Sequence, residues 1–344
     1  MTLYIRTEAN RVTATGHMMR CLAIADAAAV RGIPTVFIVA EACSERFPVE
    51  RGYRTICLNR QWDDFDGEIP VMEKLIEEHQ IGVLLIDSYF VTRTYMEAVT
   101  AVTRTAYIDD LHAAIWPCST LINYAVYYDK YNYHEEYPDI KMLLGCEYAP
   151  LRKEFVGVAE RQIRQDVKKI LVVTGGTDEY HFMKKFTETL LLHEDRLKGV
   201  ECTLICGTFN QDLEEIKMLA SQKQTFLKVL DALPTLKDAL LETDLLITAG
   251  GTTLYEMAAC GAPGICFSIA DNQLDNVEGF AERDLVLYAG DLRNDFSFDK
   301  LLQMIMDLMR DYEKRSAMSK QLRALVDGHG AEHIVDALLD GYGV

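Results

Sequence analysis

The fold is decided near the start of the chain, by the apolar segment Thr2-Leu3-Tyr4-Ile5-Arg6 and by the run Ala14-Thr15-Gly16-His17-Met18-Met19-Arg20-Cys21 that follows it. The first segment is short and β-rich, which predicts a strand. From Met18 to Arg31 apolar or small residues recur at helical spacing, so a helix should follow the glycine turn. Strand, loop and helix in this order predict an open α/β sheet, in which ligands bind outside the carboxyl ends of the strands.

Strands and helices continue to alternate through the first half of the chain. The predicted strands are Leu3–Arg6, Thr35–Ala40, Thr55–Leu58, Val83–Asp87 and Thr105–Asp109, and the predicted helices are Met18–Arg31, Val71–His79 and Thr92–Val102. This alternation predicts a parallel sheet covered on both faces. The segment from Tyr124 to Tyr137 breaks the pattern with six tyrosines and no clear period. We expect a long surface or cleft loop there, either a lid over the core or a ligand contact.

The alternation restarts near Lys168, after a polar and charged stretch from Val156 to Val167 that is typical of a linker. The predicted strands are Ile170–Thr174, Glu201–Cys206, Thr225–Leu230, Asp244–Thr248, Gly264–Ser268 and Leu285–Tyr288. From Phe298 onward the chain should be helical, with a last helix at Ala331–Leu339. We therefore expect two doubly wound, Rossmann-like α/β domains, residues 1–155 and 168–344, with the last helix able to pack back on the first domain.

The composition excludes some classes of partner. The chain has 344 residues, 49% hydrophobic and 26% charged, which is ordinary for a globular protein but long for a single core. The formal net charge is -18 at pH 7, whereas nucleic acids and anionic membrane surfaces select basic faces. We expect neither as the main partner. A small anionic ligand is compatible with this charge, because backbone N–H groups at helix N-termini bind phosphate without charged side chains.

Nine cysteines are scattered through the chain without a C-x-x-C pair. This pattern is typical of buried free thiols in a reducing compartment rather than of disulfides or a metal site. The chain begins with a strand instead of the basic and apolar segments of a signal peptide, and no stretch approaches the roughly 18 apolar residues of a membrane span. We expect a cytoplasmic protein that uses neither a metal nor a cofactor.

His17 follows Gly16 at the mouth of the first predicted helix. A lone histidine is more often structural than catalytic. The position of His17 speaks for a catalytic role, because the positive end of the helix dipole disfavours imidazolium and favours the neutral imidazole that a general base needs. The strand ends Asp87-Ser88-Tyr89 and Asp109-Asp110 should face the same cleft, unless they only cap turns.

Three further clusters follow predicted strands in the second half. In Thr174-Gly175-Gly176-Thr177-Asp178 the glycines allow a ligand to approach the backbone, and the aspartate could cap the next helix. In Thr248-Ala249-Gly250-Gly251-Thr252-Thr253-Leu254-Tyr255-Glu256 the glycine and threonine amides, with two hydroxyls, form a suitable nest for a diphosphate. Ala270-Asp271-Asn272-Gln273 offers side-chain amides suited to sugar hydroxyls or phosphate oxygens.

Each of these clusters also has a plainer interpretation, a capped turn that binds nothing. Neither a Walker lysine nor a G-x-G-x-x-G pattern is present in the sequence. An ATPase and a Rossmann dehydrogenase are therefore disfavoured.

In combination and in order, these motifs resemble the UDP-sugar hydrolases of pseudaminic acid biosynthesis. The matching segments are Gly16–Leu22, Ile86–Tyr89, Ile108–Asp110, Tyr148–Phe155, Gly175–Asp178, Ala249–Glu256 and Ala270–Gln273, so the resemblance covers most of the chain. That family is similar to the UDP-N-acetylglucosamine transferase of peptidoglycan synthesis. The resemblance therefore implies a GT-B architecture, with two Rossmann-like domains facing across a cleft.

The resemblance also implies an activity, the metal-independent hydrolysis of UDP-2,4-diacetamido-2,4,6-trideoxy-β-L-altropyranose by attack of water at the anomeric carbon. His17 would be the base for the water, and Tyr89 would line the sugar site. The implied substrate-binding residues are Gly16, Arg20, Tyr89, Gly175 and Gly176, with Gly250, Gly251, Thr252 and Thr253 for the diphosphate, Glu256 for the ribose, and Asn272 and Gln273 for the phosphate or sugar edge.

Two alternatives stay open beside hydrolysis. A diphosphate is already a good leaving group, so the site needs only to stabilise its charge and place one nucleophile, and the same groups would serve transfer to an acceptor hydroxyl. A non-catalytic nucleotide-sugar binding protein is the third interpretation, in which His17 has no task. Ala14 stands where the resembled family usually has glycine, and its methyl group takes space near the sugar, which leaves the exact sugar open.

Overall fold

A computed structural model describes residues 1–340 except 11–14, 176–177, 208–209, 224–225, 232, 234 and 295. Ala14, Gly176 and Thr177 therefore lie outside the described residues. The chain divides into two compact units, Met1–Val156 with Gly328–Val344, and Gly157–Asp327. This differs from the expected domains at the C-terminal end, because the residues from Gly328 onward group with the first unit.

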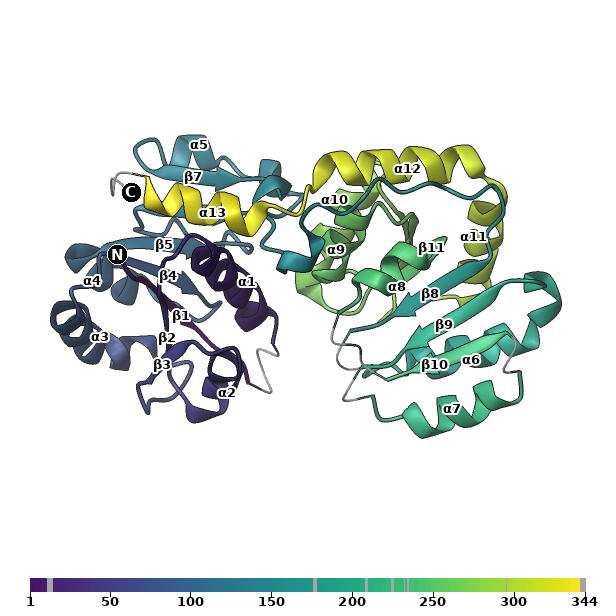
Figure 1. Ribbon diagram of the computed structural model, residues 1–344, viewed down its shortest axis with the longest axis horizontal. Helices are drawn as coiled ribbons and strands as arrows, with labels where there is room; N and C mark the ends of the chain where they lie inside the picture. The colour runs from purple at the N-terminus through teal and green to yellow at the C-terminus, as the bar shows by residue number, and fades with distance from the viewer. Residues whose placement is uncertain are drawn as a thin grey trace. The chain divides into compact units, whose positions relative to one another are not determined.

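The first unit is a parallel sheet with helical connections (Figure 1). Its strands are β1 (Leu3–Thr7), β2 (Thr35–Val39), β3 (Arg54–Cys57), β4 (Val83–Asp87), β5 (Arg104–Ile108), β6 (Thr120–Asn123) and β7 (Lys141–Leu144). Its helices are α1 (Gly16–Val30), α2 (Ala42–Glu50), α3 (Phe65–His79), α4 (Arg93–Val102), α5 (Tyr133–Glu136) and α13 (Gly330–Leu339), with short 3₁₀ turns at Tyr128–Lys130, Cys146–Tyr148 and Lys153–Phe155.

The strand order of this sheet is β3-β2-β1-β4-β5-β6-β7, and every pair is parallel. The chain therefore changes direction between β1 and β4, and the carboxyl ends of these two strands flank the crevice where ligands bind in such sheets. All five residues of β1 and of β4 are buried, as in a sheet that is covered on both faces. Tyr4, Leu84 and Ile86 pack in one core with α3 and α4.

The second unit repeats this plan. Its strands are β8 (Lys169–Val173), β9 (Glu201–Ile205), β10 (Leu227–Leu230), β11 (Leu245–Ala249), β12 (Gly264–Ser268) and β13 (Leu287–Asp291), in the parallel order β10-β9-β8-β11-β12-β13. Its helices are α6 (Phe182–Leu192), α7 (Leu213–Ser221), α8 (Lys237–Glu242), α9 (Thr253–Cys260), α10 (Leu274–Glu282), α11 (Phe298–Arg310) and α12 (Tyr312–Leu325), with 3₁₀ turns at Glu194–Leu197 and Asp271–Gln273. The direction changes here between β8 and β11.

The structure corrects the expectation for residues 124–137. Instead of a long surface or cleft loop, the segment holds a 3₁₀ turn and α5, and its tyrosines contribute to the core. Tyr124, Tyr127, Tyr133 and Tyr137 are each at most 5% exposed. Helix α2 and strands β6 and β7 were also not expected, because α2 buries little beyond Ser44 and contains Pro48, and both strands have only four residues.

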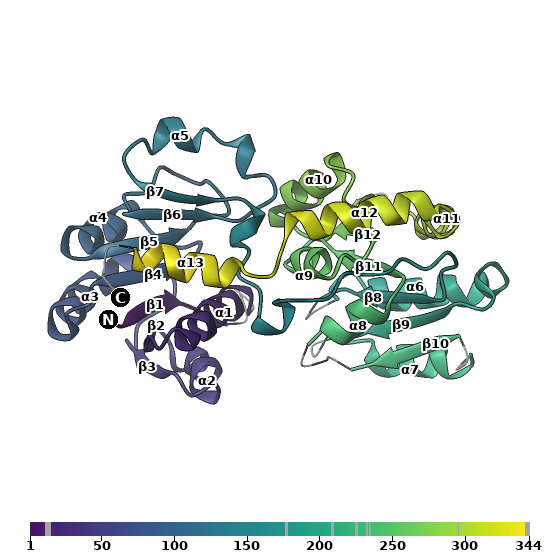
Figure 2. The same ribbon diagram turned by 45° about the horizontal axis from the view of Figure 1, so that its top comes forward.

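Helix α13 belongs to the first unit, where it lies beside α1 in both views (Figures 1 and 2). Arg31 at the end of α1 donates to both carboxylate oxygens of Asp336. Lys141 at the start of β7 donates to the Ala337 carbonyl and to Asp340, both at 2.7 Å. The last helix thus covers part of the first sheet.

The segment after Gly157 is irregular but fixed to the second unit by arginines. Arg161 donates to the carbonyl oxygens of Cys260, Thr243 and Leu240. Arg315, which is fully buried in α12, donates to the carbonyls of Arg164 and Gln165 at 2.9 and 2.7 Å. Among the helices of the described residues, none is both long enough and apolar enough to cross a bilayer.

Candidate functional site

His17 is the second residue of α1 and is almost completely buried, with 6% of its surface exposed. Its position at the mouth of a helix after β1 is therefore as the sequence indicates. Gly16 precedes it, and a Cβ added there would have no described heavy atom within 4 Å, so packing does not require this glycine. The histidine therefore follows the carboxyl end of β1, next to the carboxyl end of β4.

Asp87, the last residue of β4, orients the imidazole. It is fully buried, and its Oδ1 lies 2.6 Å from Nδ1 of His17. Burial by itself raises the pKa of Asp87, but Arg20 and His17 more than offset this and hold that pKa below its ordinary value. So close a contact with an ionised carboxylate requires a proton on Nδ1. In the neutral ring the lone pair is then on Nε2, the nitrogen that can take up a proton.

Arg20 follows His17 by three residues on the same side of α1 and is 7% exposed. Its Nε donates to Oδ2 of Asp87 at 2.6 Å, and one of its terminal nitrogens also donates to Oδ1. That terminal nitrogen lies 3.0 Å from Nδ1 of His17, but both atoms carry protons, so this contact is not a hydrogen bond. The two-point contact fixes the plane of the Asp87 carboxylate.

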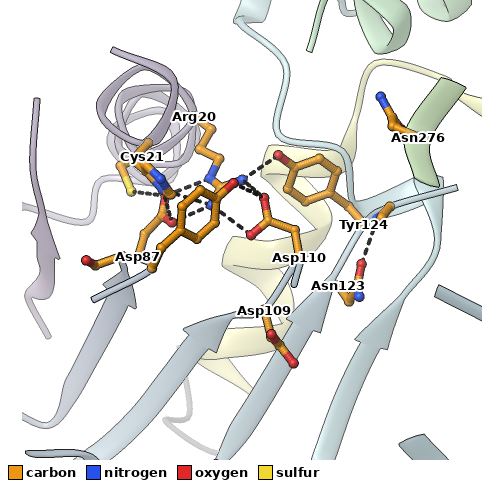
Figure 3. Close-up of polar contacts among 12 residues, drawn as sticks. Arg20, Cys21, Asp87, Asp109, Asp110, Asn123, Tyr124 and Asn276 are labelled. Carbon is orange, nitrogen blue, oxygen red and sulfur yellow. Dashed lines mark hydrogen bonds and ion pairs between the residues drawn. The ribbon is translucent and has the colours of Figure 1, made fainter. Parts of the chain in front are cut away.

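Asp110 and Tyr124 accept the remaining hydrogens of Arg20 (Figure 3). Nη1 of Arg20 donates to Oδ2 of Asp110 and to the Tyr124 hydroxyl, both at 2.7 Å. Nη2, which also contacts Asp87, donates to Oδ1 of Asp110 at 3.4 Å. All five N–H donors of the guanidinium therefore have acceptors within the protein. In this structure Arg20 is an internal member of the cluster rather than a group presented to a substrate.

Tyr89 connects this cluster to solvent. Its hydroxyl donates to Oδ2 of Asp110 at 3.0 Å. Its ring meets the His17 ring edge to face, with centroids 4.4 Å apart and planes at 79°. Because Tyr89 is 37% exposed while His17 and Arg20 are buried, its ring offers an accessible surface beside the histidine.

Asp109 points away from the cluster, which corrects the expectation that both aspartates face it (Figure 3). It is 1% exposed, accepts from the His112 amide at 2.9 Å, and accepts from the Tyr133 hydroxyl at 3.2 Å. Burial raises the pKa of Asp109 to about 6, although both hydrogen bonds favour the ionised form. This aspartate joins the β5 end to the tyrosine-rich segment.

In the second unit, the loop after β11 leads into α9. The Gly250 amide donates to the Phe267 carbonyl at 2.9 Å, and its carbonyl accepts from the Asn276 side chain at 2.9 Å. A Cβ on Gly250 would lie 2.1 Å from Cγ1 of Val277, so close packing of α10 by itself requires this glycine. The structure gives Gly250 a packing role that the sequence did not indicate.

Helix α9 begins at Thr253, with Thr252 at its N-cap and Gly251 just before it, and backbone N–H groups at a helix start have no intrahelical acceptor. Thr252 is exposed, and Thr253 and Glu256 are half-buried. The amides of Gly251, Thr252 and Thr253 have no acceptor within the part of the chain that the structure describes. Amides in this position can bind an anion, and an anion site at this loop stays a prediction.

Asn272 and Gln273 lie in the 3₁₀ turn Asp271–Gln273, after β12. The Gln273 side-chain oxygen accepts from the Ile269 amide at 3.1 Å, so only its NH₂ group remains for a ligand. Asn272 is exposed. The carboxyl ends of β11 and β12 therefore bring these side chains to the same sheet edge as the α9 amides.

The described part of the loop after β8 includes one of its two glycines, Gly175, and the predicted capping residue, Asp178. Gly175 is exposed and has a φ of +94°, a conformation that favours glycine. Asp178 caps α6 by accepting from the amides of Phe182 and Met183 at 2.9 and 2.8 Å. No group of three or more His, Cys, Asp and Glu side chains in the described ranges is arranged to hold a metal ion.

Comparison with known proteins places these loops in context. Residues 170–336 match the glycosyltransferase family 28 C-terminal domain. The spore coat polysaccharide biosynthesis protein SpsG of Bacillus subtilis (strain 168) is 26% identical over 201 residues, 58% of this chain and 58% of SpsG. A UDP-N-acetylglucosamine–N-acetylmuramyl-(pentapeptide) pyrophosphoryl-undecaprenol N-acetylglucosamine transferase of Geobacter sulfurreducens is 28% identical over 211 residues, 59% of this chain and 57% of the enzyme.

The chain thus aligns with little more than half the length of these curated relatives. Over the whole chain the similarity is structural. MurG of Acinetobacter baumannii superposes with a TM-score of 0.70 at 13% identity, covering 98% of this chain and 99% of MurG. The chain has a GT-B fold.

In this GT-B chain the family match, residues 170–336, includes the loops after β8, β11 and β12. It includes none of the residues of the His17 cluster. The comparisons therefore relate the second unit to glycosyltransferases and leave the specific resemblance to pseudaminic acid hydrolases a prediction. The roles of the individual site residues also stay predictions, although the structure shows which of them meet.

Of the residues singled out in the sequence, His17, Arg20 and Tyr89 meet in one cluster. Asp87 and Asp110 complete it from two strand ends. The contact between Arg20 and Tyr124 was not anticipated, since the residues are 104 positions apart and only the fold brings them together. The spacing of His17 and Arg20 was a usable signal, because residues three apart share a helix face.

Proposed function

We propose that the protein hydrolyses a UDP-linked sugar at the anomeric carbon, with His17 as the base. The observation that carries the proposal is the buried Asp87–His17 contact, which holds a proton on Nδ1 and leaves Nε2 to accept one. Tyr89 presents its ring beside that base and is proposed to line the sugar site. The motif resemblance suggests UDP-2,4-diacetamido-2,4,6-trideoxy-β-L-altropyranose as the substrate.

In the proposed reaction a water oxygen attacks the anomeric carbon while its proton passes to Nε2 of His17. The bond from that carbon to the diphosphate oxygen breaks, and the electron pair leaves with UDP. The amides of Gly251, Thr252 and Thr253 are proposed to hold the diphosphate, because developing negative charge is stabilised by preorganised N–H groups. Glu256, Asn272 and Gln273 are proposed contacts of the ribose and of the phosphate or sugar edge.

The family match supports nucleotide binding by the second unit, and the name of the Geobacter sulfurreducens relative specifies a UDP-sugar donor. The same names favour a second candidate function, transfer of the sugar to an acceptor hydroxyl.

The nine free cysteines, most of them buried, support activity in a reducing compartment, and we propose the cytoplasm.

The deciding experiment incubates the purified protein with the UDP-sugar in the absence of any acceptor. Release of UDP and reducing sugar at enzymatic rates supports hydrolysis. UDP release only after an acceptor is added supports transfer, and tight UDP binding without turnover under either condition supports a binding protein.

His17→Ala and Asp87→Asn test the base. His17→Ala should lose turnover while the Kd for UDP, measured by calorimetry, stays nearly unchanged. Asp87→Asn should lower kcat by about a thousandfold or more, because an amide no longer selects the tautomer with Nδ1 protonated. Asp139→Asn, at an exposed position of the same unit, is the matched control. Full turnover by His17→Ala would remove the proposed mechanism.

A further inference from the structure

We propose that Asp110 is a positioning residue that, through Arg20, holds the base His17 and the sugar-side Tyr89 in one fixed arrangement. This inference rests on the proposed function for the roles of His17 and Tyr89. The observation behind it is a closed ring of five side chains, each in contact with the next: His17, Asp87, Arg20, Asp110 and Tyr89. Figure 3 shows the contacts of Arg20 with Asp87 and Asp110.

The first part of the ring shows why Asp87 alone is not enough. A carboxylate held only by an imidazole can rotate about its side-chain bonds, and the ring would rotate with it. Arg20 prevents this by contacting both oxygens of Asp87. Arg20 in turn needs its own anchor, which Asp110 supplies from the end of β5 with a further contact from Tyr124.

The second part of the ring carries the same constraint to Tyr89. Oδ2 of Asp110 accepts from Arg20 at 2.7 Å and from the Tyr89 hydroxyl at 3.0 Å. The main-chain carbonyl of Asp110 accepts from the Tyr127 hydroxyl at 2.7 Å, which fixes the backbone at this position. The same carboxylate oxygen therefore contacts both the guanidinium and the hydroxyl of the exposed tyrosine.

Kinetics of four variants test the proposal: Asp110→Ala, Asp110→Asn, Tyr89→Phe and the double variant Asp110→Ala/Tyr89→Phe. Asp110→Ala should lower kcat by about 100-fold, as misplacement of a catalytic group does, with the Kd for UDP unchanged. Tyr89→Phe should act mainly on KM, and it should add little in the double variant because its hydroxyl partner is already gone. Asp110→Asn keeps an acceptor oxygen for Arg20 and Tyr89, so it should lower kcat less than Asp110→Ala does.

A spectroscopic measurement keeps this proposal separate from the proposed function. The Nδ1–H proton of His17 should give a sharp, slowly exchanging NMR signal in the wild-type protein. The signal should broaden in Asp110→Ala and in Arg20→Lys, since lysine lacks the planar fork, and stay sharp in the control Asp139→Asn. This arm needs no turnover, so it remains informative even if the UDP-sugar is not hydrolysed.

Two results would overturn the proposal. One is an Asp110→Ala protein whose kcat lies within twofold of wild type and whose His17 signal stays sharp. The other is strict additivity of Asp110→Ala and Tyr89→Phe. Absence of turnover in the wild-type protein would instead contradict the proposed hydrolysis, and the positioning role of Asp110 would still be tested by the NMR signal.

Discussion

At the scale of single residues, two adjacent aspartates show how much a side chain's surroundings decide. Asp110 reaches a guanidinium and a tyrosine hydroxyl, whereas Asp109 is buried against Tyr133 and the His112 amide. The sequence placed both at a strand end and gave no reason to separate them. Neighbouring residues leave a strand on opposite sides, so one serves the cluster and the other the core.

The pKa of Asp109 makes a pH-dependent prediction. That pKa is raised by burial to about 6, above the ordinary value of an aspartate, so the folded state binds the proton more tightly than the unfolded state. Stability contributed by the protonated carboxyl is present below pH 4 and is lost as the pH rises through about 6. Asp109→Asn, which stays neutral, should therefore be more stable than wild type at pH 7.5.

The difference in free energy of unfolding should be at most about 3 kcal/mol at pH 7.5 and should vanish near pH 4. Urea titrations of both proteins at several pH values measure it. A difference that does not change between pH 4 and pH 7.5 would contradict the assignment of this pKa to Asp109.

At the scale of elements, the candidate groups of each unit follow the carboxyl ends of the two strands at its change of direction and of the next strand in the sheet. In the second unit α10 packs closely against the loop after β11, at Gly250. Its would-be Cβ overlaps Val277, and its carbonyl accepts from Asn276, both on α10. The shape of the proposed diphosphate nest thus depends on how one helix packs.

Gly250→Ala should force α10 to move, lower the melting temperature by several degrees and weaken UDP binding. Val277→Ala removes the overlapping methyl groups, so the double variant should regain much of the lost melting temperature and of the lost UDP affinity. Calorimetry and thermal unfolding of the three variants measure these effects. If UDP affinity fails to recover while stability does, the glycine is needed by the ligand rather than by α10.

Arg315 fixes two elements of the second unit at once. It is fully buried in α12 and donates to the carbonyls of Leu308 and Met309 at the end of α11, as well as to those of Arg164 and Gln165. Arg315→Met should cost about 3–5 kcal/mol, because these buried acceptors lose their partner. Segment 157–167 should also become sensitive to protease.

The matched control is Arg310→Met, at an exposed position of α11, which should change stability by no more than about 0.5 kcal/mol. Chemical denaturation and limited proteolysis compare the two variants. Equal stability of both would show that the carbonyl contacts of Arg315 contribute little.

At the scale of the whole molecule, the proposed function divides the work between the two units. The base cluster is built from α1, β4 and β5 of the first unit, whereas the proposed nucleotide contacts follow β8, β11 and β12 of the second. The family 28 match covers the second group only.

Hydrogen exchange with UDP should therefore show protection in the second unit first, over residues 250–256 and 271–273, with little change around His17. In the proposed function, the contacts of the nucleotide portion all come from the second unit. Protection that appears mainly in residues 1–150 would contradict this assignment of the nucleotide site.

The sequence by itself determined the alternation of strands and helices, the two-unit plan, His17 at the mouth of a helix and the polar residues at strand ends. These follow from local periodicity and from the rule that parallel strands end at a common edge. Helix α2 and the short strands β6 and β7 escaped because they have little periodicity of their own.

Only the tertiary structure decided which of these groups act together. It brought Tyr124 to Arg20 across 104 residues, engaged every donor of Arg20 within the protein and buried four tyrosines of the segment 124–137. The physical reason is that hydrogen-bond partners and burial depend on distances between elements remote in the chain. Local patterns place a residue on its element, and packing then selects its partners.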